Sequence, residues 1–285
     1  MILIFDLVGG LCNQIIDINC SVDFAVKYNY QFSFRHCSFR YDDLQSFDNK
    51  KKFNDLFDEN IYKIISNYIP FKDISLLLNN DNTINYVSAI VNTWAKNEIA
   101  LINSLKTTLI SSKKKYIIIK QLFSIYDINH IKNNIYIKIY PNDKIMKIYN
   151  HIKKYILPKK YNFIHYRYEN DFTTFFNIKN IKSIDYLLDK IHFKNRNLKI
   201  YIACSNLKKL SNTKYLLNHF YEYKNIIIKD DYLNKYGLNN LNFEEKAFID
   251  FMIGKNAQEV YGHNKSSFSL LLNFMKNTNN FYNDL

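Results

Sequence analysis

Proline and glycine are scarce in this chain of 285 residues, which contains three prolines and five glycines. The sequence therefore has no Pro-rich or Gly-rich segment of the kind that separates domains as a flexible linker. Cysteine is almost as rare, and the four thiols show neither a C-x-x-C spacing nor the grouping with histidine that is typical of a metal site. We expect reduced thiols, as in cytosolic proteins, and no bound metal.

The chain also lacks a long hydrophobic run. No stretch approaches the roughly 20 apolar residues that cross a membrane as a helix. The apolar N-terminal segment, residues 1–8, is interrupted by Asp6 and ends at Gly9-Gly10. It also lacks the basic segment followed by an apolar core that is typical of a signal peptide. We therefore expect no membrane span and a cytoplasmic location.

Arginine is scarce among the basic residues, because only four of the 39 are arginine and the rest are lysine. The formal net charge of +13 would suit nucleic-acid binding. The lysines are scattered, however, and the excess of Asn, Lys, Ile and Tyr is typical of an AT-rich genome, so we expect no nucleic-acid partner. A basic protein still attracts small anionic substrates through its long-range field.

Hydrophobic residues make up 47% of the chain, which is enough for one or two globular domains. At the N-terminus, the pattern predicts a strand at 2–5, a helix at 14–28 and a strand at 31–34. From residue 161 onward the pattern predicts strands at 161–165, 198–204, 225–229 and 259–261, and helices at 183–193, 207–219, 243–253 and 266–276. This alternation predicts parallel sheets with helices on both faces.

The middle of the chain is harder to assign. Residues 60–68 and 97–109 have helical periodicity, whereas residues 116–119 and 135–139 have the pattern of strands. A Lys-rich stretch at 151–160 is the best candidate for a boundary. A boundary there divides the chain into an N-terminal domain at 1–157 and a C-terminal domain at 158–285. We expect two α/β halves with a cleft between them.

The first candidate site is the loop Gly9-Gly10-Leu11-Cys12-Asn13-Gln14, between the first predicted strand and the first predicted helix. Paired glycines let the backbone approach a ligand closely, and a helix N-terminus offers N–H groups to an anion or a sugar hydroxyl. The amides of Asn13 and Gln14 can each donate and accept hydrogen bonds. The alternative is an ordinary tight turn.

The second candidate is the heptapeptide His165-Tyr166-Arg167-Tyr168-Glu169-Asn170-Asp171, at the carboxyl end of a predicted strand, where α/β sheets hold ligands. In a chain so rich in lysine, Arg167 indicates a task that lysine cannot perform, such as bidentate binding of a phosphate. The alternatives are a structural ion pair of Arg167, a core role for His165, and a divalent-metal site formed by Glu169 and Asp171. The charge of Arg167 argues against the metal.

The third candidate combines Asp250, in a predicted helix, with residues 262–269, which follow a strand and open the last helix. The hydroxyl groups of Ser266 and Ser267 converge there with the N–H groups and the positive dipole end of the helix, which suits a phosphate. The alternative for Ser266 is an ordinary N-cap.

Taken together, the three motifs resemble, in order and spacing, those of the GDP-fucose O-fucosyltransferase superfamily. The Gly-Gly-Leu-Cys-Asn-Gln loop is similar to the first motif of that family, and the His-x-Arg-x-Glu-x-Asp segment is similar to its second. The helix that carries Asp250, followed by Ser-Ser-Phe-Ser, resembles the third motif. Residues 40–160 show no match.

The resemblance implies a GT-B fold, in which two Rossmann-like halves with mostly parallel sheets face a cleft. The half at 1–157 would lie on the acceptor side, and the half at 158–285 would bind the donor. The implied activity is inverting, metal-independent transfer of fucose from GDP-fucose to a hydroxyl of a protein or glycan, without a cofactor. Two alternatives are a rhamnosyltransferase of the same fold that uses a UDP- or dTDP-sugar, and a non-catalytic protein that binds nucleotide sugars or glycans.

The resemblance also implies roles for single residues. Arg167 would bind the β-phosphate and stabilise the departing GDP, Ser266 and Ser267 would share the phosphates, and His165 would support the ribose or diphosphate. Asp250 would accept hydrogen bonds from guanine. Asn13 would touch the sugar and the reacting region, and Gly9 and Gly10 would bind the donor beside it. The family has no single proton acceptor, so Glu169 and Asp171 are the candidates that this sequence offers for that role.

Overall fold

The computed structural model of the chain describes residues 2–40, 49–78, 83–86, 107, 115–120, 139–168, 173–174, 177–178, 183–194, 198–204, 226–228, 240–278 and 280–281. They form two compact units, made of the described residues within Met1–Arg40 and Ser46–Lys144 and of those within Ile145–Leu285. The division falls in helix α5 (Asp143–Tyr155), which extends into the first half of the candidate boundary stretch at 151–160.

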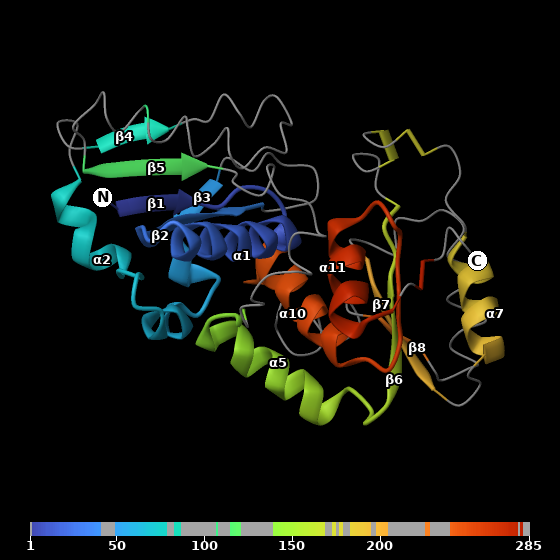
Figure 1. The fold of residues 1–285 in the computed structure, drawn as a ribbon. Helices are drawn as coiled ribbons and strands as arrows, with labels where there is room; N and C mark the ends of the chain where they lie inside the picture. Colours follow the sequence, from blue (N-terminus) through green and yellow to red (C-terminus); the bar gives the residue numbers. More distant parts are fainter. Residues whose placement is uncertain are drawn as a thin grey trace. The chain divides into compact units, whose positions relative to one another are not determined.

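The first unit contains a five-stranded sheet in the order β3-β2-β1-β5-β4 (Figure 1). The central strand β1 (Ile2–Asp6) pairs in parallel with β2 (Gln31–Phe39) on one side and with β5 (Tyr116–Lys120) on the other. Strand β4 (Thr83–Tyr86) continues the parallel set beyond β5, and β3 (Asn49–Lys52) is antiparallel to β2. All five residues of β1 are buried, as expected for a strand in the middle of a covered sheet.

Helix α1 (Leu11–Lys27) follows β1 after a short loop and packs against the sheet. Its apolar face, which includes Ile15, Ile18 and Val22, is buried as the sequence pattern predicts. The helix begins three residues earlier than predicted because Gly10 serves as its N-cap, and the N–H of Gln14 already bonds to the carbonyl oxygen of Gly10.

Short elements follow β3 and cover part of the sheet. They are η1 (Phe53–Asp55), η2 (Glu59–Ile64), α2 (Phe71–Ile74) and η3 (Ser75–Leu77). The pattern at 60–68 predicts a helix, but the structure has only the short 3-10 helix η2 there. Packing explains the difference, because this region joins a buried aromatic cluster with β2, formed by Phe32, Phe34, Phe53, Tyr62 and Tyr68.

The second unit contains a four-stranded parallel sheet in the order β8-β7-β6-β9. Its strands are β6 (Tyr161–His165), β7 (Lys199–Ala203), β8 (Ile226–Ile228) and β9 (Val260–Tyr261). The runs are short and rich in isoleucine and tyrosine, which favours strands buried on both faces.

Helices cover both faces of this second sheet (Figure 1). Helix α7 (Ile184–Lys194) packs on the face that carries Ile164, within one buried apolar cluster. Helices α10 (Phe243–Asn256) and α11 (Ser267–Lys276) lie on the other face, where the ring of Phe163 stacks with an aromatic ring of α11. Residues at odd positions of β6 therefore face α10 and α11.

The predicted alternation of strands and helices is confirmed wherever the structure describes it. The strand predicted at 161–165 is present with the predicted bounds. Present with shifted ends are the strands predicted at 2–5, 31–34, 116–119, 198–204, 225–229 and 259–261, and the helices predicted at 14–28, 183–193, 243–253 and 266–276. The patterns at 207–219, and almost all of those at 97–109 and 135–139, lie outside the described residues.

Candidate functional site

Two loops leave the second sheet at the carboxyl ends of neighbouring strands. Strands β7 and β8 extend from one side of β6, whereas β9, which comes after them in the chain, pairs with β6 on the other side. Loops diverge where the strand order reverses in this way, and the crevice between them is where α/β sheets bind ligands. The second motif follows β6, and residues 262–269 of the third follow β9, so the fold brings these two segments together.

His165, at the end of β6, is held by the first turn of α11. Its Nδ1 atom lies 2.8 Å from the Oγ atom of Ser269. Its ring stacks on Phe268, with 4.3 Å between the ring centroids and 26° between the planes. The side chain is partly exposed rather than enclosed in the core. The ring therefore has a fixed position and orientation at the edge of the sheet.

The first turn of α11 has no side-chain cap. Ser266 occupies the N-cap position with an extended backbone, but its hydroxyl accepts no hydrogen bond from that turn. The turn contains no acidic residue, and Ser267 is partly exposed. Helix N-terminal N–H groups without a capping acceptor favour a bound anion. The arrangement differs from the ordinary N-cap that was the alternative for Ser266.

Gly262, after β9, permits a close approach between the strand end and α11. A Cβ atom at this position would lie 2.2 Å from the Oγ atom and 2.4 Å from the Cβ atom of Ser269. The backbone N–H of the next residue, His263, donates to the same Oγ at 3.2 Å. The absence of a side chain at Gly262 is therefore what lets Ser269 sit between β9 and His165.

Arg167 lies two residues beyond the last residue of β6. The N–H of Tyr166 donates to the carbonyl oxygen of Ala203 at 2.8 Å, so the backbone pairing with β7 extends one residue past the strand. Alternation along an extended chain then places Arg167 on the same side as His165. The side chain is partly exposed, as an anion-binding guanidinium has to be.

Asp250, in α10, is buried and has a partner in the sheet. Its side chain is 4% exposed, and its Oδ1 atom accepts a hydrogen bond of 2.6 Å from the hydroxyl of Tyr201 in β7. The Tyr201 ring in turn stacks on Phe163, with 5.5 Å between centroids. A carboxylate oxygen can accept more than one hydrogen bond, so the bond from Tyr201 does not exhaust the capacity of Asp250.

The glycine loop belongs to the first unit. Gly9 has φ +96°, a value that side chains rarely allow, and the side chain of Asn13 lies over it. Gly10 and Asn13 are partly exposed. A ligand can therefore reach the backbone of the loop and one amide side chain.

Gln14, by contrast, is a structural residue of this loop. It is fully buried, and its Nε2 atom donates to the carbonyl oxygens of Gly9, at 2.8 Å, and Ser38, at 2.9 Å. Its Oε1 atom accepts from the N–H of Ser38 at 3.3 Å. Gln14 thus ties the loop after β1 to the end of β2, and all of these bonds are internal.

Sequence reasoning missed Arg40, which follows β2. Its Nη2 atom lies 3.4 Å from the position that a Cβ atom of Gly10 would take, and the residue is 7% exposed. A guanidinium group is thus placed beside the N-terminus of α1. The scarcity of arginine was the one signal in the sequence that pointed to it.

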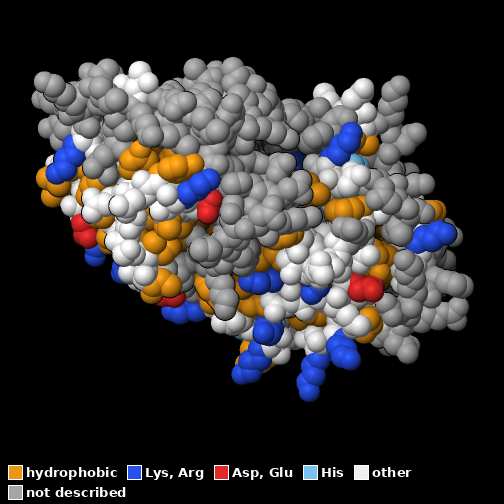
Figure 2. All heavy atoms as spheres, in the orientation of Figure 1, with side chains coloured by type: hydrophobic (Ala, Val, Ile, Leu, Met, Phe, Trp, Pro, Cys, Tyr) orange, Lys and Arg blue, Asp and Glu red, His pale blue; other side chains and the backbone are white. Residues whose placement is uncertain are grey.

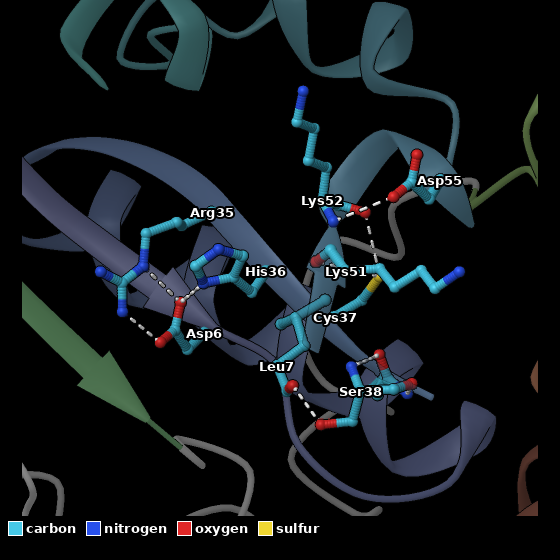
Figure 3. Close-up of polar contacts among 10 residues, drawn as sticks. Asp6, Leu7, Arg35, His36, Cys37, Ser38, Lys51, Lys52 and Asp55 are labelled. Carbon is cyan, nitrogen blue, oxygen red and sulfur yellow. Dashed lines mark hydrogen bonds and ion pairs between the residues drawn. The ribbon is translucent and has the colours of Figure 1, made fainter. Parts of the chain in front are cut away.

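A second group that the sequence did not reveal surrounds Asp6 at the end of β1 (Figure 3). Both side-chain oxygens of Asp6 accept hydrogen bonds from Arg35, one of them from Nε at 2.8 Å, and the Nδ1 atom of His36 lies 3.3 Å from Oδ1. Burial by itself would raise the pKa of Asp6, but the hydrogen bonds and charges of Arg35 and His36 outweigh it and lower the pKa to about 2. Asp6 is therefore a buried carboxylate that keeps its negative charge and binds Arg35 and His36.

Glu169 and Asp171, the predicted proton acceptors, lie outside the described residues. Within the described part of the chain, no three His, Cys, Asp or Glu side chains gather as metal ligands would. None of the helices that the structure describes is long and apolar enough to cross a membrane. On the face drawn in Figure 2, the described Lys and Arg side chains stand in separate groups among other residue types.

No family model and no curated protein sequence matches the chain. Solved structures do match its fold. A structure of POFUT1 in complex with GDP-fucose has a TM-score of 0.67 and 10% identity, covering 99% of this chain and 97% of that one. A structure of NodZ alpha-1,6-fucosyltransferase soaked with GDP-fucose has a TM-score of 0.54 and 10% identity, covering 96% and 92%.

A third match is a mutant of Arabidopsis thaliana FUT1 in complex with GDP, with a TM-score of 0.52 and 12% identity, covering 97% of this chain and 68% of that one. At such identities the likeness establishes the fold. The chain has the mixed α/β fold of these fucosyltransferases, with mostly parallel sheets, and the predicted GT-B fold class is confirmed. The expected resemblance to the GDP-fucose fucosyltransferase superfamily is confirmed at the level of the fold.

Proposed function

We propose that the protein is an inverting, metal-independent glycosyltransferase that moves fucose from GDP-fucose to a hydroxyl of a protein or glycan. One observation carries the proposal. At the strand-order reversal of a parallel sheet, His165 contacts Ser269 in the first turn of α11, and that turn has no side-chain cap. Arg167 follows His165 by two residues at the same strand end. The same fold occurs in structures solved with GDP-fucose.

The diphosphate of the donor suits the positive groups that follow β6 and open α11. Arg167 supplies a planar pair of donors for the β-phosphate, and the hydroxyls of Ser266 and Ser267 and the N–H groups of α11 supply the others. Attack by the acceptor hydroxyl on the anomeric carbon forms the new glycosidic bond and breaks the bond to the β-phosphate. The electron pair of that bond leaves with GDP, and Arg167 stabilises the charge that develops there.

Guanine recognition is assigned to Asp250. Its carboxylate accepts from the N1–H and 2-amino groups of guanine, a pair of donors that adenine lacks. The hydroxyl of Tyr201 holds the carboxylate in place from the sheet.

We assign Gly9, Gly10 and Asn13 to donor binding, with Asn13 at the sugar and the reacting region. Glu169 or Asp171 takes the proton of the acceptor hydroxyl. Because charge stabilisation comes from Arg167 and the helix N-terminus, we expect EDTA to leave the rate unchanged.

The test is donor turnover by the purified protein, measured as GDP released from GDP-fucose with and without acceptor candidates. Arg167→Lys replaces the planar guanidinium group, which can donate two parallel hydrogen bonds, by a compact ammonium group. We expect the rate to fall on the order of 10²–10³-fold. Lys159→Arg is a matched exchange on an exposed side chain of the same unit and should leave the rate unchanged. Wild-type turnover in Arg167→Lys would rule out the assigned role.

The donor base needs a separate test, because Asp250 is almost fully buried and already bonded to Tyr201. The shift in melting temperature on addition of GDP, UDP or dTDP shows which nucleotide base the protein binds. Stabilisation by GDP alone supports the guanine assignment, whereas preference for UDP or dTDP favours a rhamnosyltransferase of the same fold. Binding of GDP without turnover of any donor, even by slow hydrolysis, favours a non-catalytic nucleotide-sugar-binding protein.

A further inference from the structure

Ser269, in the first turn of α11, has a hydroxyl with a restricted set of partners. The residue is fully buried, so no solvent reaches it. Its Oγ atom accepts a hydrogen bond of 3.2 Å from the N–H of His263 and lies 2.8 Å from the Nδ1 atom of His165. Neither sequence motif nor family resemblance assigned a role to this serine.

The proton of the Ser269 hydroxyl can be placed by elimination. A hydroxyl carries one proton to donate and two lone pairs with which to accept. The backbone N–H of His263 is itself a donor, so the Oγ atom must accept there. Of its two contacts only Nδ1 of His165 can receive the proton, and a buried hydroxyl without an acceptor would cost roughly 1–3 kcal/mol.

This placement fixes the tautomer of His165. If Nδ1 accepts the proton from Ser269, the proton of the neutral imidazole resides on Nε2. The ring of His165 also stacks on the ring of Phe268, with 4.3 Å between the two ring centroids, and this contact restricts its rotation. His165 therefore presents an N–H group on the side of its ring that points away from Ser269.

We propose that Ser269 is a positioning residue that holds His165 as the Nε2–H tautomer, so that the ring donates a hydrogen bond to an anionic oxygen of the donor diphosphate. The ligand half of this inference, that is, the hydrogen bond from His165 to the donor diphosphate, rests on the proposed function. The opposite tautomer would turn the lone pair of Nε2 toward the anion and repel it. The contact between Ser269 and His165 also requires glycine at position 262, because a Cβ atom there would displace the Oγ atom of Ser269.

The tautomer is measured by nitrogen NMR on the full-length protein labelled with ¹⁵N-histidine, without any ligand. The seven histidines are few enough to resolve, and His165→Gln assigns the signal. We expect Nδ1 of His165 unprotonated and Nε2 protonated in the wild-type protein. In Ser269→Ala a mixture of tautomers should appear, and in Ser269→Cys, which keeps the shape with a weaker donor, an intermediate state.

The control variant is Ser183→Ala, which removes another serine hydroxyl of the same unit. The Ser183 hydroxyl accepts from the N–H of Tyr186 at the start of α7. Its loss affects a helix cap but should leave the His165 signal unchanged. A wild-type protein with its proton on Nδ1, or a Ser269→Ala variant that keeps the wild-type pattern, would overturn the assignment.

Binding of GDP tests the ligand half. If removal of the Ser269 hydroxyl leaves about half of the molecules in the competent tautomer, GDP affinity falls on the order of twofold. His165→Ala removes the donor altogether and should weaken binding on the order of tenfold or more. A loss in Ser269→Ala as large as that in His165→Ala would make Ser269 a direct ligand and refute the positioning role.

The two proposals fail in different ways. If wild-type protein binds neither GDP nor GDP-fucose, the proposed function is wrong, and the ligand half of the inference is wrong with it. The tautomer assignment is decided by the NMR measurement alone, since that measurement needs no ligand.

Discussion

Gln14 offers the most direct test of how the glycine loop is held. Its side chain is fully buried and makes hydrogen bonds to three backbone groups, two carbonyl oxygens and one N–H, in Gly9 and Ser38. Gln14→Met keeps most of the volume and removes all three bonds. Each buried backbone group left without a partner costs roughly 1 kcal/mol or more, so we expect a loss of about 3 kcal/mol in the free energy of unfolding.

Gln14→Ala adds a packing defect to the same loss. The missing side-chain atoms leave a space beneath the loop, and we expect a total cost of about 4–5 kcal/mol. The difference between the two variants separates packing from hydrogen bonding. The comparison matters for function because the bond to Gly9 fixes the loop that we assign to donor binding.

The assay is chemical denaturation followed by circular dichroism, with the midpoint and slope compared among variants. Gln31→Ala is the matched control, because Gln31 is an exposed glutamine at the first position of β2. It should change the unfolding free energy by no more than about 0.5 kcal/mol. If Gln14→Met is within about 1 kcal/mol of wild type, the three bonds do not support the loop and the reasoning fails.

Two further predictions concern stability. The pKa of Asp6 is lowered from 3.8 to about 2, so its stabilising effect is complete above about pH 4 and is lost as the pH falls toward 2. Denaturation over this range should show the wild type losing about 2 kcal/mol that Asp6→Asn does not lose, and parallel curves would contradict this. Gly262→Ala places a methyl group 2.2 Å from the Oγ atom of Ser269 and should cost about 1–3 kcal/mol. Gly10→Ala, where the nearest atom is 3.4 Å away, is its control, and equal losses in the two variants would refute the packing argument.

The strands and helices near both ends of the chain were predictable, because they are set by local patterns. Short apolar runs such as residues 161–165 form strands, and the spacing of Ile15, Ile18 and Val22 is that of one helix face. The helical pattern at 60–68 failed because neighbouring aromatic rings in β2, far away in the sequence, decide how that segment packs. Local periodicity carries no information about such partners.

The candidate site was predictable in outline and not in detail. The places of His165, Arg167 and Ser266 at the ends of strands and helices could be read from the sequence, whereas their roles stay predictions. Gln14 had the same hydrogen-bonding capacity as Asn13, and nothing in the sequence indicated that one side chain would be buried and the other partly exposed. The bond from Gln14 to Ser38 joins residues 24 positions apart, which no local pattern predicts.

By itself, the sequence determined seven of the nine strands that the structure describes, all but β3 and β4. It also determined the alternation of strands and helices from residue 161 onward and the presence of polar motifs next to strand ends. These properties depend on residues within a few positions of each other. Only the tertiary structure decided which groups meet: His165 with Ser269 across 104 positions, and Asp250 with Tyr201 across 49. The order of strands β6 and β9 and the missing side chain at Gly262 bring the first pair together, and the resulting contact, rather than either motif, sets where the proton of the histidine resides.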